Sequence, residues 1–315
     1  MPNKVTQLLP STPDGVATAA DLLGEGGLVS FPTETVYGLG ADATNDTAVA
    51  RIFAAKGRPS FNPLIAHVAD VETAKRYVEW SDAAQKLADA FWPGPLSLVL
   101  PLKQNAGMSH LVTAGLTSLA IRIPAHPVAH QLLEAVGGPV AAPSANPSGK
   151  ISPTRATHVI DGLGGKIEAV IDGGDCAVGL ESTIVGLLGE PALLRPGGVP
   201  AEDIEAALGA KLKHDTSPDT LLAPGQMSSH YAPGAAVRLN ATDWQAGELR
   251  LGFGHVACDL NLSASGDLIE AAANLFRHLH ALDRMEGGRI AVSPIPDQGL
   301  GRAINDRLKR AAAPR

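Results

Sequence analysis

The sequence predicts an α/β protein of two domains joined by a linker. Stretches that alternate between apolar and polar residues are repeatedly followed by stretches whose apolar residues recur at helical spacing. The length of 315 residues exceeds that of an average single domain. Residues 211–233 contain several prolines and few periodic apolar positions, as linkers do. We therefore predict a first domain over residues 1–209, a linker over 210–235 and a second domain over 236–315.

Composition and charge argue against several classes of protein. Apolar residues make up 45% of the chain and charged residues 18%, which is typical of a folded globular protein. The formal net charge of −7 argues against a general nucleic-acid binder, which needs many cations. The sequence has no apolar run long enough for a membrane span or a secretion signal, so we expect a cytoplasmic protein. Cys176 and Cys258 lie far apart and suggest neither a zinc site nor a disulfide framework.

The first predicted elements place hydroxyl groups on one face of a strand. A helix over residues 14–23 leads to a strand that begins at residue 28 and continues to Tyr37. Because side chains alternate along a strand, Thr33, Thr35 and Tyr37 are expected to share one face. A turn at the two glycines that follow is expected to end this strand.

The next helix is predicted to end in a cluster of cations. Thr44 or Asn45 can cap its N-terminus, and its apolar residues recur at helical spacing as far as Lys56. Gly57 suits the left-handed conformation that often follows a helix, so Arg58 is expected just beyond the helix end. Cations here can simply stabilise the helix by about 0.3 to 1 kcal/mol each, or they can belong to an anion site.

A second strand favours the anion site. The turn that begins at Asn62 opens a strand over residues 64–68, whose polar residue His67 lies close in sequence to the same corner. We therefore expect Lys56 and Arg58 to be neighbours of both polar residues.

The middle of the first domain is predicted to contain an apolar strand with one polar face. A helix capped by Ser81 ends at the rigid turn of residues 92–95, and a strand over residues 96–100 follows. In the next strand, Ser118 and Arg122 point away from the apolar face. Arg122 can be held in a salt bridge, or its planar guanidinium can bind a carboxylate through two hydrogen bonds.

A short polar loop in the same domain has the features of a phosphate-binding loop. A helix that opens at residues 126–127 and runs to residue 137 leads to a strand over 140–143, after which Ser144 and Asn146 begin the loop. Ser152 is the predicted N-cap of the helix that follows. Hydroxyls and backbone N–H groups that converge on a helix start can bind an anion, although a plain turn has the same pattern. The Walker sequence is absent.

The remainder of the first domain adds a hydroxyl and a cation. A strand over residues 168–172 is expected to lie beside a strand over residues 181–185. Ser182 in the latter can offer its hydroxyl to a ligand or to a neighbouring strand. The next strand ends in Arg195, and a helix over residues 200–208 closes the domain.

The second domain is predicted to be a small parallel three-layer domain of Rossmann-like type. Its predicted strands cover residues 249–254, 256–260 and 289–293, and its predicted helices cover residues 266–285 and 300–311. The sequence G-x-G-x-x-G is absent, so we expect this domain to bind no dinucleotide.

Two motifs stand close together in the first domain: P-T-E-T-V-Y-G-L-G over residues 32–40 and K-x-R-P-x-x-N-P-L over residues 56–64. Together they resemble the threonylcarbamoyl-AMP synthases, the YrdC-like domain family. The resemblance continues through F-W-P-G-P-L-S over residues 91–97, S-A-N-P-S-G over residues 144–149 and the segment 296–307. It therefore spans nearly the whole chain.

The resemblance implies a fold and an activity. The fold would be a YrdC-like twisted mixed sheet with flanking helices and an open anion-binding cavity, followed by the small Rossmann-like domain. The activity would be the condensation of L-threonine, bicarbonate and ATP to threonylcarbamoyl-AMP and pyrophosphate, for threonylcarbamoyladenosine modification of tRNA beside the anticodon. Mg²⁺ is expected with ATP, held by ligands that the sequence does not reveal. The tRNA threonylcarbamoyl-transferase machinery is the expected downstream partner.

The resemblance also implies roles for individual residues. Lys56 and Arg58 are expected to be catalytic. The residues expected at L-threonine and bicarbonate are Thr33, Thr35, His67, Arg122, Ala142 and Ser182. The residues expected at ATP are Arg58, Asn62, Ser118, Ser144, Asn146, Ser152, Arg195 and Tyr231. The linker segment 224–233 also resembles the family and is expected to cover the site, but Ala223 replaces the usual serine, so that hydroxyl contact is not expected.

Two other functions compete with this interpretation. The first is a non-catalytic RNA-binding module, which the acidic net charge disfavours. The second is a carbamoyl-adenylate-forming protein of the hydrogenase-maturation type, which would carry cysteine-rich zinc segments that this sequence lacks. No pairing of serine or cysteine with a base is evident, and formation of an anhydride with AMP needs none, because the substrate itself attacks phosphorus.

Overall fold

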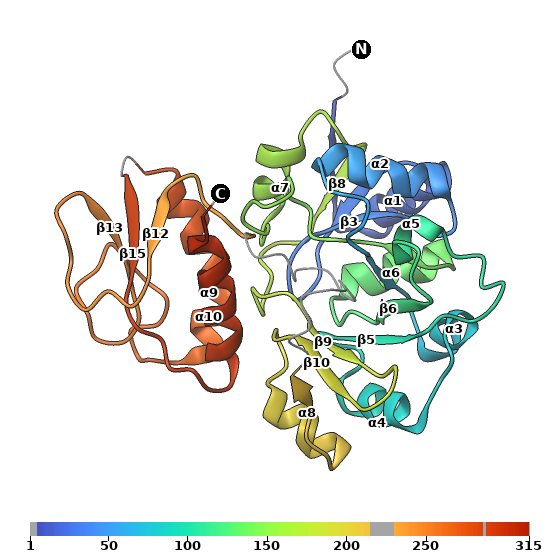
Figure 1. The fold of residues 1–315 in the computed structure, drawn as a ribbon. Helices are drawn as coiled ribbons and strands as arrows, with labels where there is room; N and C mark the ends of the chain where they lie inside the picture. The colour runs from blue at the N-terminus through green and yellow to red at the C-terminus, as the bar shows by residue number, and fades with distance from the viewer. Residues whose placement is uncertain (1–4, 215–229, 286–287, 315) are drawn as a thin grey trace.

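The computed structural model describes residues 5–214, 230–285 and 288–314, which form two α/β domains (Figure 1). The elements coloured blue to yellow form the first, larger domain, and the orange and red elements form the second. Residues 215–229, which contain most of the predicted linker and most of the motif over 224–233, lie outside the described residues.

A mixed sheet forms the centre of the first domain. Its strands are β1 (Gln7–Pro10), β2 (Val29–Phe31), β3 (Gly38–Asp42), β4 (Ile65–His67), β5 (Leu96–Pro101), β6 (Ser118–Arg122), β7 (Val140–Ala141), β8 (Ala169–Asp172), β9 (Thr183–Gly186), β10 (Ala192–Arg195) and β11 (Lys213–His214). Within the described residues they pair in the order β1-β8-β2-β3-β7-β4-β6-β5-β9-β10-β11. β4 and β6 are parallel, whereas β5 and β6 are antiparallel, so the predicted mixed sheet is confirmed.

Helices flank this sheet, and several of their predicted ends are confirmed. The helices are α1 (Pro13–Gly24), α2 (Asp46–Lys56), α3 (Val71–Tyr77), α4 (Asp82–Phe91), α5 (His110–Thr113), α6 (Pro127–Val136), α7 (Ala156–Leu163) and α8 (Ala201–Leu208). Asn45 caps α2 by accepting a hydrogen bond from the backbone N–H of Ala48 at 3.1 Å. Gly57 follows α2 with a φ of 61°, in the left-handed conformation that turns the chain toward Arg58.

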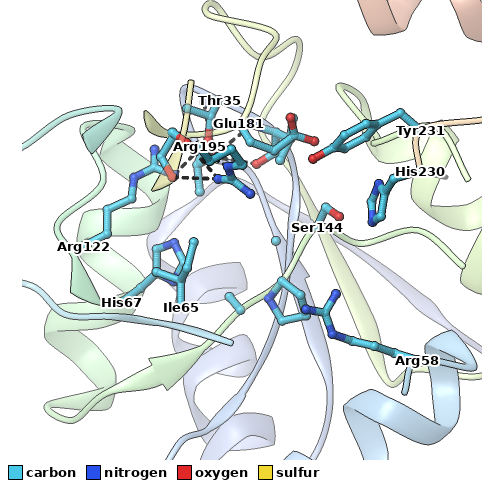
Figure 2. Close-up of a pocket in the computed structure, with 16 residues that line it drawn as sticks. Thr35, Arg58, Ile65, His67, Arg122, Ser144, Glu181, Arg195, His230 and Tyr231 are labelled. Atoms are coloured by element: carbon cyan, nitrogen blue, oxygen red, sulfur yellow. Dashed lines mark hydrogen bonds between the residues drawn. The ribbon is translucent and has the colours of Figure 1, made fainter. Parts of the chain in front are cut away.

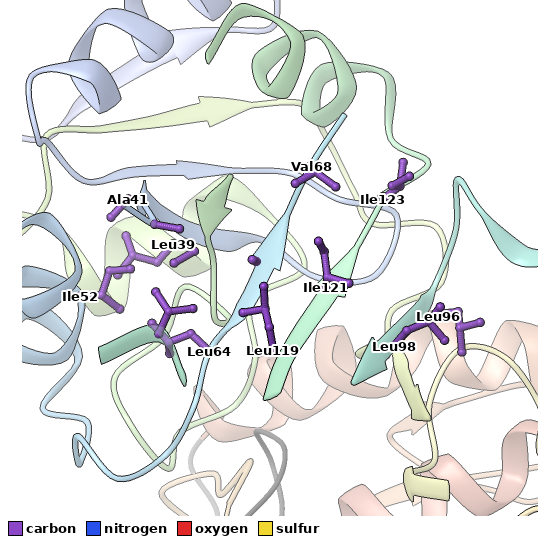
Figure 3. Packing of buried hydrophobic residues seen from close by; sticks show 14 of the residues in the cluster. Leu39, Ala41, Ile52, Leu64, Val68, Leu96, Leu98, Leu119, Ile121 and Ile123 are labelled. Atoms are coloured by element: carbon purple, nitrogen blue, oxygen red, sulfur yellow. The ribbon is translucent and has the colours of Figure 1, made fainter. Parts of the chain in front are cut away.

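Apolar side chains from the central strands pack against the helices. Figure 3 shows part of the largest cluster, in which the labelled residues are Leu39, Ala41, Ile52, Leu64, Val68, Leu96, Leu98, Leu119, Ile121 and Ile123. Leu119, Ile121 and Ile123 lie in this cluster, whereas Ala120 belongs to a separate cluster. This division confirms the predicted faces of β6 and leaves Arg122 on the face away from the main core.

A parallel sheet forms the second domain, as predicted. Its strands β12 (Ala236–Arg238), β13 (Glu248–Gly252), β14 (Leu260–Asn261) and β15 (Arg289–Val292) pair in the order β12-β15-β13-β14. Its helices are α9 (Leu268–Asp283) and α10 (Leu300–Ala312). Figure 1 shows both helices on the same side of this sheet, facing the first domain. The described residues therefore form two layers here, where three are predicted.

The predicted strand through Tyr37 is wrong after Phe31. Residues 32–37 form a bend, and Gly38 begins β3 rather than a turn. The Thr33 hydroxyl donates to the carbonyl oxygen of Val36 at 2.6 Å and accepts from the backbone N–H groups of Thr35 and Val36 at 3.2 Å. Local side-chain hydrogen bonds of this kind compete with strand pairing, and here they hold the chain in a turn.

The predicted helix start at Ser152 and one predicted strand pairing are also wrong. α7 begins at Ala156, after residues 150–155 that belong to no helix or strand. The Ser152 hydroxyl instead donates to Oε1 of Glu181 at 2.5 Å. β9 pairs with β5 and β10 and not with β8, because β8 lies between β1 and β2 near the far edge of the sheet.

Within the part of the chain that the structure describes, no helix combines the length and the hydropathy that a membrane crossing requires.

Candidate functional site

A cavity opens on the face of the central sheet that bears Arg122 (Figure 2), and together with the adjoining open solvent its space measures about 530 Å³. Its walls come from segments that are distant in sequence, including the 32–37 bend, the end of α2, strands β4 and β6, and the loop after β7. The residues that line it are Thr33, Thr35, Val36, Gly38, Arg58, Ile65, His67, Arg122, Ala142, Pro143, Ser144, Glu181, Ser182, Arg195, His230 and Tyr231.

Arg58 presents a buried cation to this cavity. Its guanidinium donates to the carbonyl oxygen of Pro63 at 3.0 Å and to that of Asn62 at 3.4 Å through Nε and Nη2. Burial lowers its pKa to about 10, so it remains charged at neutral pH. Within the described residues, Nη1 of Arg58 meets no acceptor and no carboxylate pairs with the side chain. A buried guanidinium in this condition is suited to an anionic ligand.

Lys56 lies behind the cavity wall rather than on it. Its Nζ donates to the carbonyl oxygens of Ser144 and Asn146, at 2.5 Å each. Burial holds the pKa of Lys56 well below its usual value, with a further contribution from the Arg58 charge. Lys56 therefore fastens the 144–146 loop to the end of α2 and fixes the place of the Ser144 side chain, which does line the cavity.

Arg122 is paired inside the protein and still faces the cavity. Its Nη2 donates to Oε1 of Glu34 at 2.5 Å, its Nη1 to the Thr35 hydroxyl at 3.0 Å, and its Nε to the carbonyl oxygen of Gly94 at 3.0 Å. The salt-bridge interpretation is thus confirmed. These three bonds use one N–H on each nitrogen, so within the described residues one N–H remains on each terminal nitrogen of the five-donor guanidinium. A carboxylate bound at Arg122 would accept from these two N–H groups.

Arg195 and Glu181 form the wall near the second domain. Arg195 donates to the carbonyl oxygen of Ser182 at 2.8 Å and to its hydroxyl at 3.2 Å, while the same hydroxyl lies 2.8 Å from that of Ser97. Burial lowers the pKa of Arg195. Burial alone would raise the pKa of Glu181, but the charges of Arg307 and Arg195 hold it below its usual value. Glu181 is therefore an anion in its buried position.

Two cavity histidines are uncharged at neutral pH. Burial, followed by the Arg122 charge, lowers the pKa of His67 to about 3, and burial also lowers that of His230 to about 3. Within the described residues, Nδ1 of each ring is buried without a hydrogen-bond partner. A neutral imidazole with an open nitrogen can receive or donate a hydrogen bond to a bound molecule.

These depressed pKa values predict acid sensitivity of the fold. His67 takes up a proton near pH 6.5 when unfolded but only near pH 3 when folded, so the unfolded state binds more protons between these values. Stability is therefore lost as pH falls below 6.5, by up to about 2 kcal/mol per histidine at pH 5. We expect urea unfolding to show that the free energy of unfolding falls less between pH 7 and pH 5 in His67→Gln than in the wild type. The exposed-site variant His110→Gln is the control, and an equal loss in His67→Gln would contradict this assignment.

The structure brings most of the predicted site residues together. Those that line the cavity are Thr33, Thr35, Arg58, His67, Arg122, Ala142, Ser144, Ser182, Arg195 and Tyr231. The predicted residues that lie outside its lining are Lys56, Asn62, Ser118, Asn146 and Ser152, all of which are buried. Asn62 and Lys56 contact the segments that carry lining residues, and Ser152 binds Glu181.

Some of the residues that line the cavity were not among the predicted site residues. Glu181 and His230 line the cavity, together with Val36, Gly38, Ile65 and Pro143. Glu181 directly precedes the predicted Ser182, so sequence adjacency was the available signal for it. His230 lies in the segment 224–233, where the sequence suggested that His230 and Tyr231 fold back over the nucleotide, with a plain surface loop as the alternative. Arg307, the partner of Glu181 in the second domain, lies at the end of the segment 296–307 that resembles the family, but no site role was predicted for it.

The acidic side chains do not fit a metal held by the protein alone. Among the lining residues the only carboxylate is that of Glu181, and its two oxygens already accept from Ser152 and Arg307. In the described part of the chain, no three His, Cys, Asp or Glu side chains form a metal-binding group. Mg²⁺ commonly takes one or two carboxylates, phosphate oxygens and water, which makes the phosphates of a nucleotide its main ligands here.

Comparisons with known proteins agree over nearly the whole length. Residues 21–197 match a family model described as telomere recombination, and residues 199–313 match one described as threonylcarbamoyl-AMP synthase, C-terminal domain. The threonylcarbamoyl-AMP synthase of Pyrococcus abyssi is 42% identical, with 94% of each chain covered. That of Bacillus subtilis is 41% identical, covering 99% of this chain and 96% of the relative. A crystal structure of P. abyssi Sua5 complexed with L-threonine matches with a TM-score of 0.90 and 40% identity, covering 98% of each chain.

Proposed function

The chain belongs to the threonylcarbamoyl-AMP synthase family, and from this premise we propose how its cavity carries out the synthesis. The substrates are L-threonine, bicarbonate and ATP, and the products are threonylcarbamoyl-AMP, pyrophosphate and water. We assign the reaction to the first domain, over residues 1–209, and we assign a covering role to the end of the linker over 210–235. Residues 236–315 form the second domain.

The observation that carries this proposal is the meeting of three buried guanidinium groups in one cavity. Arg58, Arg122 and Arg195 come from three separate segments and all line it. One lining carboxylate, that of Glu181, is present to offset them among the lining residues. Each of the three substrates carries negative charge at some end, so this cavity provides the cations that such a set of reactants requires.

L-Threonine is assigned to the end of the cavity that contains Arg122 and His67 (Figure 2). The two remaining terminal N–H groups of Arg122 would bind the threonine carboxylate. Thr35, held by Arg122, and the neutral ring of His67 border the same space and would contact the amine and hydroxyl. Thr33 fixes the bend that positions Thr35, and Ala142 and Ser182 complete this end.

ATP is assigned to the opposite end, where Figure 2 shows Arg58, Ser144, His230 and Tyr231. Nη1 of Arg58 points to the phosphates in this assignment. Ser144, whose backbone carbonyl oxygen is held by Lys56, would add a hydrogen bond from its hydroxyl. Tyr231 is only 1% exposed and offers an aromatic surface from the end of the linker, which would exclude water from the adenylate. Mg²⁺ would come with the ATP phosphates.

Arg195 lies between these two ends in Figure 2, where the bonds change. The threonine amine adds to the carbon of bicarbonate, water leaves, and a carbamate forms. A carbamate oxygen then attacks the α-phosphorus of ATP, and the bond to pyrophosphate breaks. Arg195 and Arg58 would stabilise the charge that develops on the leaving pyrophosphate. The remaining ATP assignments are indirect: Asn62 holds Arg58, while Asn146, Ser152 and Ser118 support the walls from buried positions.

The test is release of pyrophosphate with each substrate omitted in turn. We expect release only when L-threonine, bicarbonate and ATP are all present, because the carbamate is the nucleophile. Bicarbonate must be removed from the buffer and replaced in a controlled way. Pyrophosphate release at an unchanged rate without threonine would contradict the proposal.

A further inference from the structure

Arg307 of the second domain is a fully buried cation that reaches the first domain. It lies on α10, and its side chain is 0% exposed. Its Nε donates to Oε2 of Glu181 at 2.7 Å, and its Nη2 donates to the carbonyl oxygen of Pro196 at 3.0 Å. Its Nη1 donates to Oδ2 of Asp306 at 2.6 Å. A buried charge is tolerated when its donors are satisfied in this way.

The groups that Arg307 contacts belong to the cavity wall. Glu181 and Tyr231 both line the cavity, and Pro196 directly follows the lining residue Arg195. The Arg307 guanidinium carbon lies 5.1 Å from the centre of the Tyr231 ring, within the range of a cation–π contact. Figure 2 shows Glu181, Arg195 and Tyr231 along one wall of the cavity. One side chain of the second domain therefore contacts two lining residues.

Both carboxylate oxygens of Glu181 accept hydrogen bonds from residues outside the cavity lining. Oε1 accepts from the Ser152 hydroxyl and Oε2 accepts from Arg307. Its carbonyl oxygen accepts from the backbone N–H of Gly198 at 3.0 Å. At Gly197 an added Cβ would lie 2.3 Å from that same carbonyl oxygen, so the 181 and 196–198 segments are in direct backbone contact. The backbone contacts fix the position of Glu181, and Arg307 fixes the orientation of its carboxylate.

We propose that Arg307 is a positioning residue of the active site, through which the second domain holds Glu181 and Tyr231 in the arrangement that receives ATP. This inference rests on the proposed function. Glu181 is the one carboxylate among the lining residues, and the charges of two buried arginines, Arg307 and Arg195, act on it. If Arg307 is removed, Arg195 remains as the buried cation acting on the Glu181 charge. The carboxylate then offsets positive charge that the proposed function assigns to the ATP phosphates.

The test compares Arg307→Gln with Arg302→Gln by steady-state kinetics. Arg302 lies on the same helix and pairs with Glu202 of the first domain at 2.8 Å, so its replacement removes an interdomain ion pair away from the cavity. We expect Arg307→Gln to raise the KM for ATP about tenfold, which is the size of effect that coupling between residues in contact produces. The KM for L-threonine is expected to change less. Arg302→Gln is expected to match wild type. Equal KM values for ATP in both variants would overturn the proposal.

A double variant separates positioning from a purely structural role. In Glu181→Gln/Arg307→Gln the carboxylate is gone, so we expect the KM for ATP to fall back toward the wild-type value. Damage to the domain interface alone would make the double variant as poor as Arg307→Gln or poorer, which would overturn the proposal. If Arg307→Gln fails to fold, Arg307→Lys is measured in its place, because lysine keeps the positive charge but lacks the planar guanidinium with its several fixed N–H donors. We expect a raised KM for ATP in Arg307→Lys, and a wild-type value in the folded variant would overturn the proposal.

These experiments distinguish a failure of the role proposed for Arg307 from a failure of the proposed function. Wild-type protein that releases no pyrophosphate from the three substrates would refute the proposed function itself. Wild-type activity, together with Arg307→Gln that behaves as Arg302→Gln does, would refute only the role of Arg307. Thermal unfolding of each variant shows whether its kinetics were measured on folded protein.

Discussion

Replacement of Arg58 by alanine is expected to lower kcat/KM for pyrophosphate release by about a hundredfold to a thousandfold, as removal of one preorganised charge-stabilising donor does. Arg58 is buried, stays charged at neutral pH, and presents Nη1 to the cavity without an acceptor among the described residues. Its cation is therefore available where the pyrophosphate leaves. The measurement is the steady-state rate of pyrophosphate release as a function of ATP concentration, with L-threonine and bicarbonate saturating.

A matched control uses an arginine of the same domain outside the cavity. Arg76 on α3 is exposed, so Arg76→Ala is expected to retain the wild-type rate. Arg58→Lys adds a second comparison, because lysine keeps the charge but cannot bind phosphate through two parallel bonds. We expect it to recover only part of the activity. Wild-type kcat/KM in Arg58→Ala would remove Arg58 from the reaction.

Replacement of Lys56 by methionine is expected to reduce both stability and activity. Lys56 supplies hydrogen bonds to two buried carbonyl oxygens, those of Ser144 and Asn146, and methionine supplies none. The Ser144 carbonyl oxygen still accepts from the backbone N–H of Asn146 at 3.0 Å, so the change leaves the Asn146 carbonyl oxygen as the unsatisfied buried acceptor. We therefore expect a loss of about 1–3 kcal/mol in the free energy of unfolding. Because the loop carries Ser144 into the cavity, its displacement is also expected to raise the KM for ATP. Urea unfolding and steady-state kinetics measure the two effects.

Lys86→Met is the control for this change. Lys86 lies on α4 and is exposed, so its loss is expected to alter neither the unfolding free energy nor the kinetics appreciably. A Lys56→Met variant with wild-type stability would show that the two carbonyl contacts are not needed. Full stability with lost activity would instead place the Lys56 ammonium at the substrate during the reaction.

Local sequence signals predicted the parts of the site that depend on local backbone conformation. Asn45 and Gly57 mark the two ends of α2 because a side-chain cap and a left-handed glycine are properties of single positions. Arg58 is therefore placed correctly beyond the helix. The alternation along β6 likewise placed Arg122 opposite the apolar face, because a strand has a period of two.

The same signals failed where a side chain bonds to the backbone or to a distant residue. The Thr33 hydroxyl turns the chain within three residues, and strand alternation takes no account of such a bond. Ser152 has the sequence signature of an N-cap, but its hydroxyl binds Glu181 instead. In both cases a polar side chain found a partner that a periodic pattern cannot represent.

Contacts between residues that are far apart in the sequence, and contacts between the two domains, could not be predicted. Lys56 turns toward Ser144, 88 positions away, and thus supports the wall rather than lining the cavity. Arg307 meets Glu181 across 126 positions and across the boundary between two domains. The order of the eleven strands described for the first domain brings such segments together, and that order is not encoded in the spacing of any single motif.

The most direct measurement of the central claim is mass spectrometry of the small-molecule product formed from ATP, L-threonine and ¹³C-labelled bicarbonate. The claim is that buried arginines of one cavity gather three anionic substrates, which react with one another without a protein nucleophile. We predict an adenylate that contains threonine and one labelled carbon, formed with an equal amount of pyrophosphate. An adenylate without the label, or ADP and phosphate in place of pyrophosphate, would contradict the account.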